Sequence, residues 1–210
     1  MASSPTIIAL DRAHLITLMH NEIQAHGLQC DLNCIDVSRI TDFSCLFQSA
    51  AFYKFKGDIS GWDVSNATDM TSMFQDSRFN GDLSAWNVGN VEMMCNMFQG
   101  SRFMGDISRW NTGKVTDMRS MFSKASFSGD LSQWNVARVE SFSHMFFQSK
   151  FNGDVSQWDT STAYDMGRMF ACSPFKGDLS GWNVGNVRDM QGMFLESIFM
   201  GDIARWNTGR

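Results

Sequence analysis

A motif that returns every 24 residues is the feature that most constrains this chain. Gly-Asp pairs occur seven times at this spacing, with their aspartates running from Asp58 to Asp202. The seven tryptophans keep the same register from Trp62 to Trp206, and a Met-Phe pair recurs from Met73 to Phe194. One unit of this length cannot bury its own apolar face, whereas stacked units bury a continuous core. The repeat therefore predicts an elongated stack of units.

The period divides the chain into a 1–30 N-terminal cap and a 31–210 repeat array. In the cap, Asp11 is expected to begin a helix that runs from about Arg12 to Ala25, ends at Gly27 and covers the first unit. The predicted units lie near 31–56, 57–80, 81–104, 105–128, 129–152, 153–176, 177–200 and, as a partial unit, 201–210. The first unit is degenerate, and its link, within 48–56, is three residues longer than the other links.

Inside one unit the hydrophobic period changes. Residues 82–88 form a short stretch with large and β-branched residues, which favours a strand, whereas Val91, Met94, Met97 and Phe98 share one face of a short helix. A strand and a short helix in each unit predict an α/β fold, a right-handed leucine-rich-repeat-like solenoid of about eight units. Each glycine of the Gly-Asp pairs is expected to supply a positive φ before the strand.

Two columns of residues are predicted to be structural. The buried indoles should form one ladder, with loop carbonyls as partners for their N–H groups. The aspartates should form the other ladder by accepting backbone N–H bonds from the adjoining turn. The tryptophan ladder comprises Trp62, Trp86, Trp110, Trp134, Trp158 and Trp182, and the aspartate ladder comprises Asp58, Asp82, Asp106, Asp130, Asp154 and Asp178. A calcium-binding array is the alternative for the aspartates, although one carboxylate per unit falls short of the roughly six to eight oxygens that calcium prefers.

The repeat resembles a known family. Residues 79–88 read Phe-Asn-Gly-Asp-Leu-Ser-Ala-Trp-Asn-Val, and Met-x-x-Met-Phe follows at 94–98. These motifs are similar to the BspA-like leucine-rich-repeat family of bacteria, whose repeat also occurs in mycoplasma lipoproteins, and the resemblance covers residues 31–208. It implies a role in adhesion or host recognition, and the family offers no catalytic motif to transfer to this chain.

Positions that vary between the units are the candidates for partner binding. The residue before each tryptophan changes from copy to copy, while its neighbours are fixed by packing. Arg109, Gln133, Gln157 and Arg205 occupy this column and are the predicted partner-binding residues. The leading hypothesis is a protein–protein interaction module that is not an enzyme and needs no cofactor, and its protein partner is unidentified.

Net charge and hydropathy argue against nucleic-acid binding and against a membrane span. A formal net charge of −5 disfavours nucleic acid as a partner. No apolar run approaches the length of a membrane span, and no signal peptide is recognised at Met1. These features favour a cytoplasmic chain, with a cell-surface or secreted location by a non-standard route as the alternative. The last unit lacks its helix, so we expect the C-terminal edge to stack on a second copy and form a homodimer. The alternative function is therefore that of a self-assembling structural protein.

Overall fold

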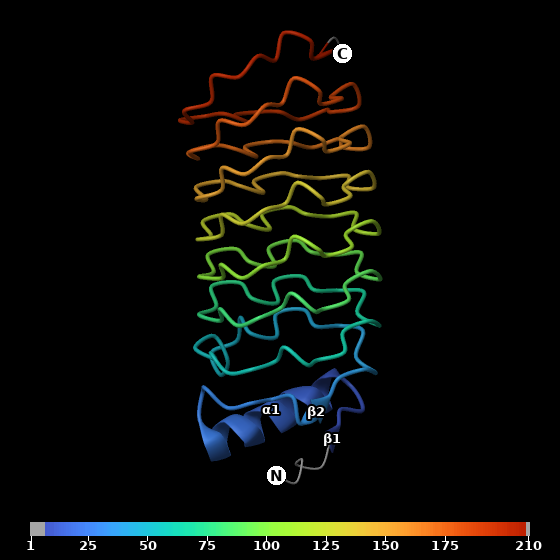
Figure 1. The fold of residues 1–210 in the computed structure, drawn as a ribbon, viewed down its shortest axis with the longest axis vertical. Coiled ribbons are helices and arrows are strands. Elements are labelled where there is room, and N and C mark those ends of the chain that lie inside the picture. The colour runs from blue at the N-terminus through green and yellow to red at the C-terminus, as the bar shows by residue number, and fades with distance from the viewer. Residues whose placement is uncertain (1–6, 209–210) are drawn as a thin grey trace.

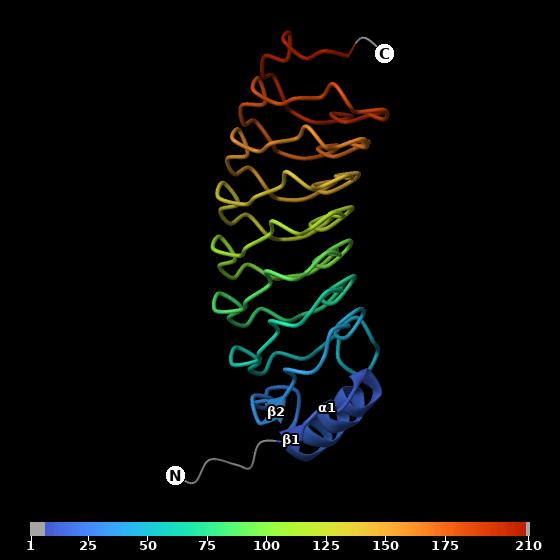
Figure 2. The same ribbon diagram turned by 90° about the vertical axis from the view of Figure 1, so that its right-hand side faces the viewer.

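A computed structural model describes residues 7–208. The chain winds into flat coils that follow one another along a single axis, with one helix at the N-terminal end (Figures 1 and 2). The three regular elements are β1 (Ile7–Ile8), α1 (Arg12–His26) and β2 (Ile35–Asp36). Residues 1–6 of the predicted cap and residues 209–210 of the partial last unit lie outside the described residues.

The N-terminal helix is present as predicted. Asp11 caps α1 by accepting the N–H of His14 at 2.8 Å, and Gly27, with φ of 84°, ends it by donating to the carbonyl of Ile23. Leu15 and Met19 are fully buried against the first coil. Beside the helix, β1 pairs in parallel with β2. The helix therefore covers the end of the stack where the first coil would otherwise expose its apolar face (Figure 2).

The coils differ from the predicted units in the half that was expected to be helical. Between 27 and 208 the structure contains no helix, and the Met-x-x-Met-Phe segment instead joins each coil to the next. The N–H groups of Met70, Ser72, Phe74 and Asp76 donate, in this order, to the carbonyls of Met93, Cys95, Met97 and Gln99 at 2.9, 2.9, 2.9 and 2.7 Å. Of the intervening N–H groups, those of Met73 and Gln75 bond to the carbonyl three residues earlier, and that of Thr71 bonds to Oδ1 of Asp69. Every second N–H therefore leaves its own coil, which a helix does not allow.

Left-handed residues explain why no helix forms there. Ser72 and Asp76 have φ values of 54° and 55°, and the corresponding residues of the following coils repeat this conformation. A left-handed residue interrupts a right-handed helix, at a cost that the inter-coil hydrogen bonds offset. The same segment carries the parallel bridges between coils, for example Asp69 with Met93.

The predicted strand is also replaced, by two tight turns. Asp82 accepts the N–H of Ser84 at 2.8 Å, and Asn87 accepts that of Gly89 at 3.1 Å. Between these corners the N–H of Trp86 bonds to the carbonyl of Leu83 at 3.1 Å. Leu83, Trp86 and Val88 are still buried, so the large and β-branched residues that predicted a strand indicate burial and not strand pairing.

The glycines of the Gly-Asp pairs have a different role from the predicted one. Gly27, Gly100 and Gly192 are the glycines with positive φ within residues 7–208, and none of them belongs to a Gly-Asp pair. A Cβ at Gly105 would instead stand 2.7 Å from Cζ of Phe103. The phenylalanine ring folds back over the backbone two residues later, and only glycine leaves room for it.

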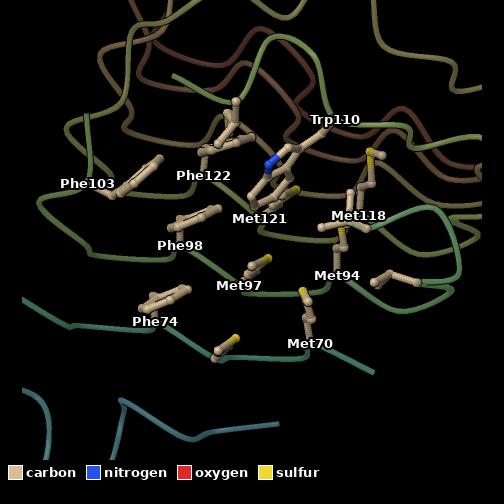
Figure 3. Packing of buried hydrophobic residues seen from close by; sticks show 14 of the residues in the cluster. Met70, Phe74, Met94, Met97, Phe98, Phe103, Trp110, Met118, Met121 and Phe122 are labelled. Atoms are coloured by element: carbon tan, nitrogen blue, oxygen red, sulfur yellow. The ribbon is translucent and has the colours of Figure 1, made fainter. Parts of the chain in front are cut away.

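The core consists of columns of side chains that run along the stack. Met70, Met94 and Met118 lie one above another, as do Phe74, Phe98 and Phe122 (Figure 3). The ring centroids of Phe74 and Phe98 are 5.5 Å apart, and those of Phe98 and Phe122 are 5.6 Å apart. Because each ring contacts its counterparts in the coils above and below, the interior is shared between coils and no coil has a core of its own.

Candidate functional site

The predicted partner-binding residues lie on one edge of the stack. Arg109, Gln133, Gln157 and Arg205 are all exposed. The first three belong to successive coils, whereas Gly181 occupies the same position between Gln157 and Arg205. The structure therefore brings three of the four residues together and leaves Arg205 two coils away from the nearest of them.

This edge offers hydrogen-bond donors. The backbone N–H groups of Arg109, Gln133 and Gln157 make no hydrogen bond within residues 7–208. The Gln133 and Gln157 amides each donate to the hydroxyl of the preceding serine, at 3.3 and 3.2 Å. A guanidinium, two amides and three free N–H groups thus follow one another along the stack. We name the surface of Arg109, Gln133 and Gln157 the donor edge.

The tryptophan ladder is buried, as predicted. Trp62, Trp86, Trp110, Trp134, Trp158 and Trp182 are each 3–4% exposed. Each indole N–H donates to a backbone carbonyl of the preceding coil, for example Trp110 to Leu83 at 3.0 Å. The ladder therefore ties coils together, and its aromatic surface is unavailable to a ligand.

The aspartate ladder accepts backbone N–H groups, as predicted. In Asp58, Asp82, Asp106, Asp130, Asp154 and Asp178, Oδ1 accepts the N–H of the residue two positions later at 2.8–2.9 Å. This hydrogen bond is the main cause that lowers the pKa of Asp82 and Asp106 below the usual range. One oxygen of each carboxylate is thus committed to a turn. Across the described part of the chain, no three His, Cys, Asp or Glu side chains come together to hold a metal ion.

A groove beside the phenylalanine columns was not predicted. It has a volume of about 410 Å³ and is lined by Lys56, Arg78, Asn80, Arg102 and Met104. Its three cations make no ion pair with any residue between 7 and 208. The sequence contained a pattern that could have predicted this groove, because its lining residues directly precede or follow the repeated phenylalanines.

A second hollow of about 250 Å³ lies over the inter-coil ladder and is lined by Cys95, Asn96, Arg119, Ser120, Ser143 and His144. Asp117 and Arg119 form an ion pair of 2.6 Å beside it. This hydrogen-bonded pair raises the pKa of Arg119 above its usual value. Burial is the main cause that raises the pKa of the Cys95 thiol, so this cysteine remains a thiol at neutral pH and is a poor nucleophile.

A third hollow, larger than these two, lies between α1 and the first coil. Its volume is about 520 Å³, and its walls are Arg12, Ile16, Thr17, His20, Cys45, Leu46, Ser49, Ala51 and Phe52. Three of these residues belong to the segment 48–56, where the first link is longer than the others. The sequence located the insertion but gave no sign that a hollow would form beside it.

Comparison with known proteins identifies the family but no characterised relative. No curated protein and no solved structure matches the chain. In the described part of the chain, no helix is both long and apolar enough to cross a membrane. A family model matches three overlapping segments, residues 17–128, 100–174 and 116–210, as expected of a repeat protein. The chain therefore belongs to the family described as "Mycoplasma protein of unknown function, DUF285".

Proposed function

We propose that this chain is a protein-binding module that recognises an extended partner along the donor edge. The supporting observation is that the position before each tryptophan is exposed from Gly61 to Arg205, while the repeated residues around it are used for packing and turns. Positions fixed by the fold cannot vary without loss of stability, whereas the residue before each tryptophan can. A rigid row of varied side chains suits recognition, and repeat proteins use such surfaces for binding.

The chemistry of the donor edge indicates the kind of partner. Donors outnumber acceptors on it: the Arg109 guanidinium, the second N–H of each glutamine amide and three backbone N–H groups are free, against the two Oε1 atoms of Gln133 and Gln157. A partner segment rich in carbonyl or carboxylate oxygens would satisfy these donors. Arg109 supplies the strongest contact, because a guanidinium binds a carboxylate through two parallel hydrogen bonds.

Photo-crosslinking tests the proposal. In the test variant, a benzophenone amino acid replaces Gln133. In the control variant it replaces Arg138, which is exposed at a different corner of the coil. We expect crosslinks to a partner from position 133 and not from position 138. Binding of the identified partner is then measured with R109A/Q133A/Q157A, which should weaken it at least about tenfold, or ~1.4 kcal/mol. Unchanged affinity in the triple variant would refute the donor edge as the binding surface.

Self-association is the second candidate function. Near the end of the stack, Phe194 and Phe199 are only partly buried, whereas their counterparts one coil earlier, Phe170 and Phe175, are fully buried. A second copy that stacks there would bury these side chains. Light scattering over a range of concentrations tests this candidate, since a monomer at high concentration contradicts it.

The proposal also covers the architecture of the chain and its location in the cell. Parallel bridges between residues 24 positions apart, such as Met93 and Asp117, support a solenoid of stacked coils, and a right-handed leucine-rich-repeat-like form of it is our proposal. The five free cysteines favour a cytoplasmic location, because a reducing compartment preserves thiols. The resemblance to BspA-like proteins favours adhesion at the cell surface instead, and fractionation of cells that produce the protein distinguishes the two.

A further inference from the structure

The strongest unassigned feature of the molecule is the groove of about 410 Å³ beside the phenylalanine columns, which we name the cation groove. Three successive coils build it, and its lining residues are Lys56 from the first coil, Arg78 and Asn80 from the second, and Arg102 and Met104 from the third. All five are exposed, while the repeated phenylalanines next to them are buried. The buried rings therefore fix where each coil presents its groove residues.

The protein does not balance the charge of this groove. Lys56, Arg78 and Arg102 make no ion pair with any residue between 7 and 208, although the chain has 22 acidic residues and a net charge of −5. Asp58 and Asp82, which follow Lys56 and Asn80 by two residues, instead hold backbone N–H groups at 2.8 Å. Cations on neighbouring coils repel one another, and an anion that binds between them would remove this repulsion.

The cations also form a column that follows the stack. The position directly before the repeated phenylalanine carries a cation in three successive coils, at Lys54, Arg78 and Arg102. The ring centroids of Phe55 and Phe79, the residues that follow the first two of these cations, lie 6.3 Å apart. An extended peptide presents every second side chain on the same side, at intervals of about 6.6 Å. A peptide that runs along the stack would therefore place one side chain of each pair at each coil.

Asn80 provides a donor whose orientation the fold determines. Its Oδ1 accepts the N–H of Met104 at 2.7 Å, so its amide nitrogen remains available to a ligand oxygen. At the end of the groove Met104 is 62% exposed and offers an apolar contact. Three coils span roughly twice the spacing of two parallel strands, a distance that one compact anion cannot bridge. An extended ligand with several negative charges fits this arrangement better.

We propose that the cation groove binds an extended acidic peptide that runs along the stack and carries carboxylates at alternate residues. These carboxylates pair with Arg78, Arg102 and Lys56, and Asn80 donates to the same segment. A peptide is favoured over nucleic acid because the net charge of −5 repels a long polyanion outside the groove. The inference does not rest on the donor edge, since the two surfaces share no residue.

Two peptides of the same composition test the spacing. The first is Ser-Glu-Ser-Glu-Ser-Glu-Ser and the second is Ser-Ser-Glu-Glu-Glu-Ser-Ser, each with a neutral coumarin label, and fluorescence anisotropy measures their binding in about 0.15 M salt. We expect saturable binding of the alternating peptide and several-fold weaker binding of its isomer. Equal affinities, or no saturable binding of either peptide, would overturn the proposal.

Two charge-matched variants test the location. R78E/R102E should weaken binding of the alternating peptide at least about tenfold. K150E/K176E makes the same change in net charge at exposed positions beside the phenylalanines of later coils, and it should leave binding nearly unchanged. Thermal unfolding checks that both variants keep the fold. Equal losses in the two variants would refute the cation groove as the site.

Phosphate ligands give the last comparison. Unlabelled pyrophosphate and an oligothymidylate compete with the alternating peptide, and we expect each to displace it only at higher concentration than the unlabelled peptide does. Displacement at lower concentration by either competitor would contradict a peptide ligand and assign the groove to phosphate or to single-stranded nucleic acid.

Discussion

The indole N–H of Trp86 donates a 3.1 Å hydrogen bond to the carbonyl oxygen of Ile59, which lies 27 residues earlier in the preceding coil. On this side of the stack, residues 79–91 and 103–115 exchange no backbone–backbone hydrogen bonds. The backbone ladder holds only the opposite side, through residues such as Phe74 and Met97. The tryptophans, together with polar side chains such as Asn80 and Asn90, therefore supply the directional contacts between coils where the backbone supplies none.

Replacement of Trp86 by Phe should destabilise the protein. Phenylalanine keeps an aromatic ring in the stack but leaves the buried carbonyl of Ile59 without its donor, which costs roughly 1–3 kcal/mol. Trp206→Phe is the matched control, because its hydrogen bond to Leu179 is similar in length at 2.9 Å but only partly buried. Urea denaturation should show a clearly larger loss for Trp86→Phe. Equal losses would mean that burial of the hydrogen bond does not determine its contribution.

Glycine substitutions should separate two kinds of glycine. Gly105→Ala brings a Cβ to 2.7 Å from Cζ of the Phe103 ring, and we expect it to cost roughly 1–3 kcal/mol through displaced core packing. At Gly181 the nearest atom to an added Cβ is the Ser156 oxygen at 3.8 Å, and Ala85 already occupies this column in another coil. Gly181→Ala should therefore be neutral or stabilise by up to about 1 kcal/mol. Thermal or urea unfolding of the two variants gives the comparison, and a neutral Gly105→Ala would contradict the proposed role of the ring.

The sequence predicted the period, the inward columns, the helix α1 and the N–H-accepting aspartates, because each depends on burial or on short-range turn chemistry. The sequence did not predict the backbone conformation within each coil. The spacing of Val91, Met94, Met97 and Phe98 fits a helix, but Asn96 between them has φ of 56°. The residues that adopt this conformation in the other coils include serine, histidine and arginine, which carry no consistent signal for positive φ. Contacts between coils, absent from any single unit, select it.

The sequence did not predict the pockets either. The hollow between α1 and the first coil depends on the distance of α1 from Leu46 and Phe52, and a periodic pattern does not specify that distance. The donor edge was easier to predict, since a variable position beside an invariant buried tryptophan is exposed in any regular stack. Periodicity thus predicts which side chains face outward. It does not predict the hollows, of which one arises beside α1 where periodicity fails and two lie over regular coils.

The lowered pKa values predict loss of stability in acid. Hydrogen bonds from backbone N–H groups hold the pKa of Asp106 below its ordinary value of 3.8. A carboxyl with a lower pKa in the folded state contributes stability above its unfolded pKa, and this contribution is lost as pH falls through the folded value. Asp106→Asn keeps an oxygen acceptor for the N–H of Ser108 but cannot titrate. Urea unfolding of this variant should depend less on pH below about 4 than that of the unaltered protein. An identical pH dependence would show that the Asp106 turn does not contribute.

Calcium should leave the stability of the protein unchanged. Each coil contributes one carboxylate to the aspartate ladder, and Oδ1 of residues such as Asp130 is already bonded to a backbone N–H at 2.8 Å. Calcium prefers roughly six to eight oxygen ligands, so binding would require the turns to open and lose these hydrogen bonds. A ligand that binds only the folded state raises the melting temperature in a concentration-dependent way. We therefore expect the same melting temperature in calcium and in chelator, with magnesium as the control for ionic strength. A saturable rise with calcium alone would show that the free Oδ2 atoms act together across the stack.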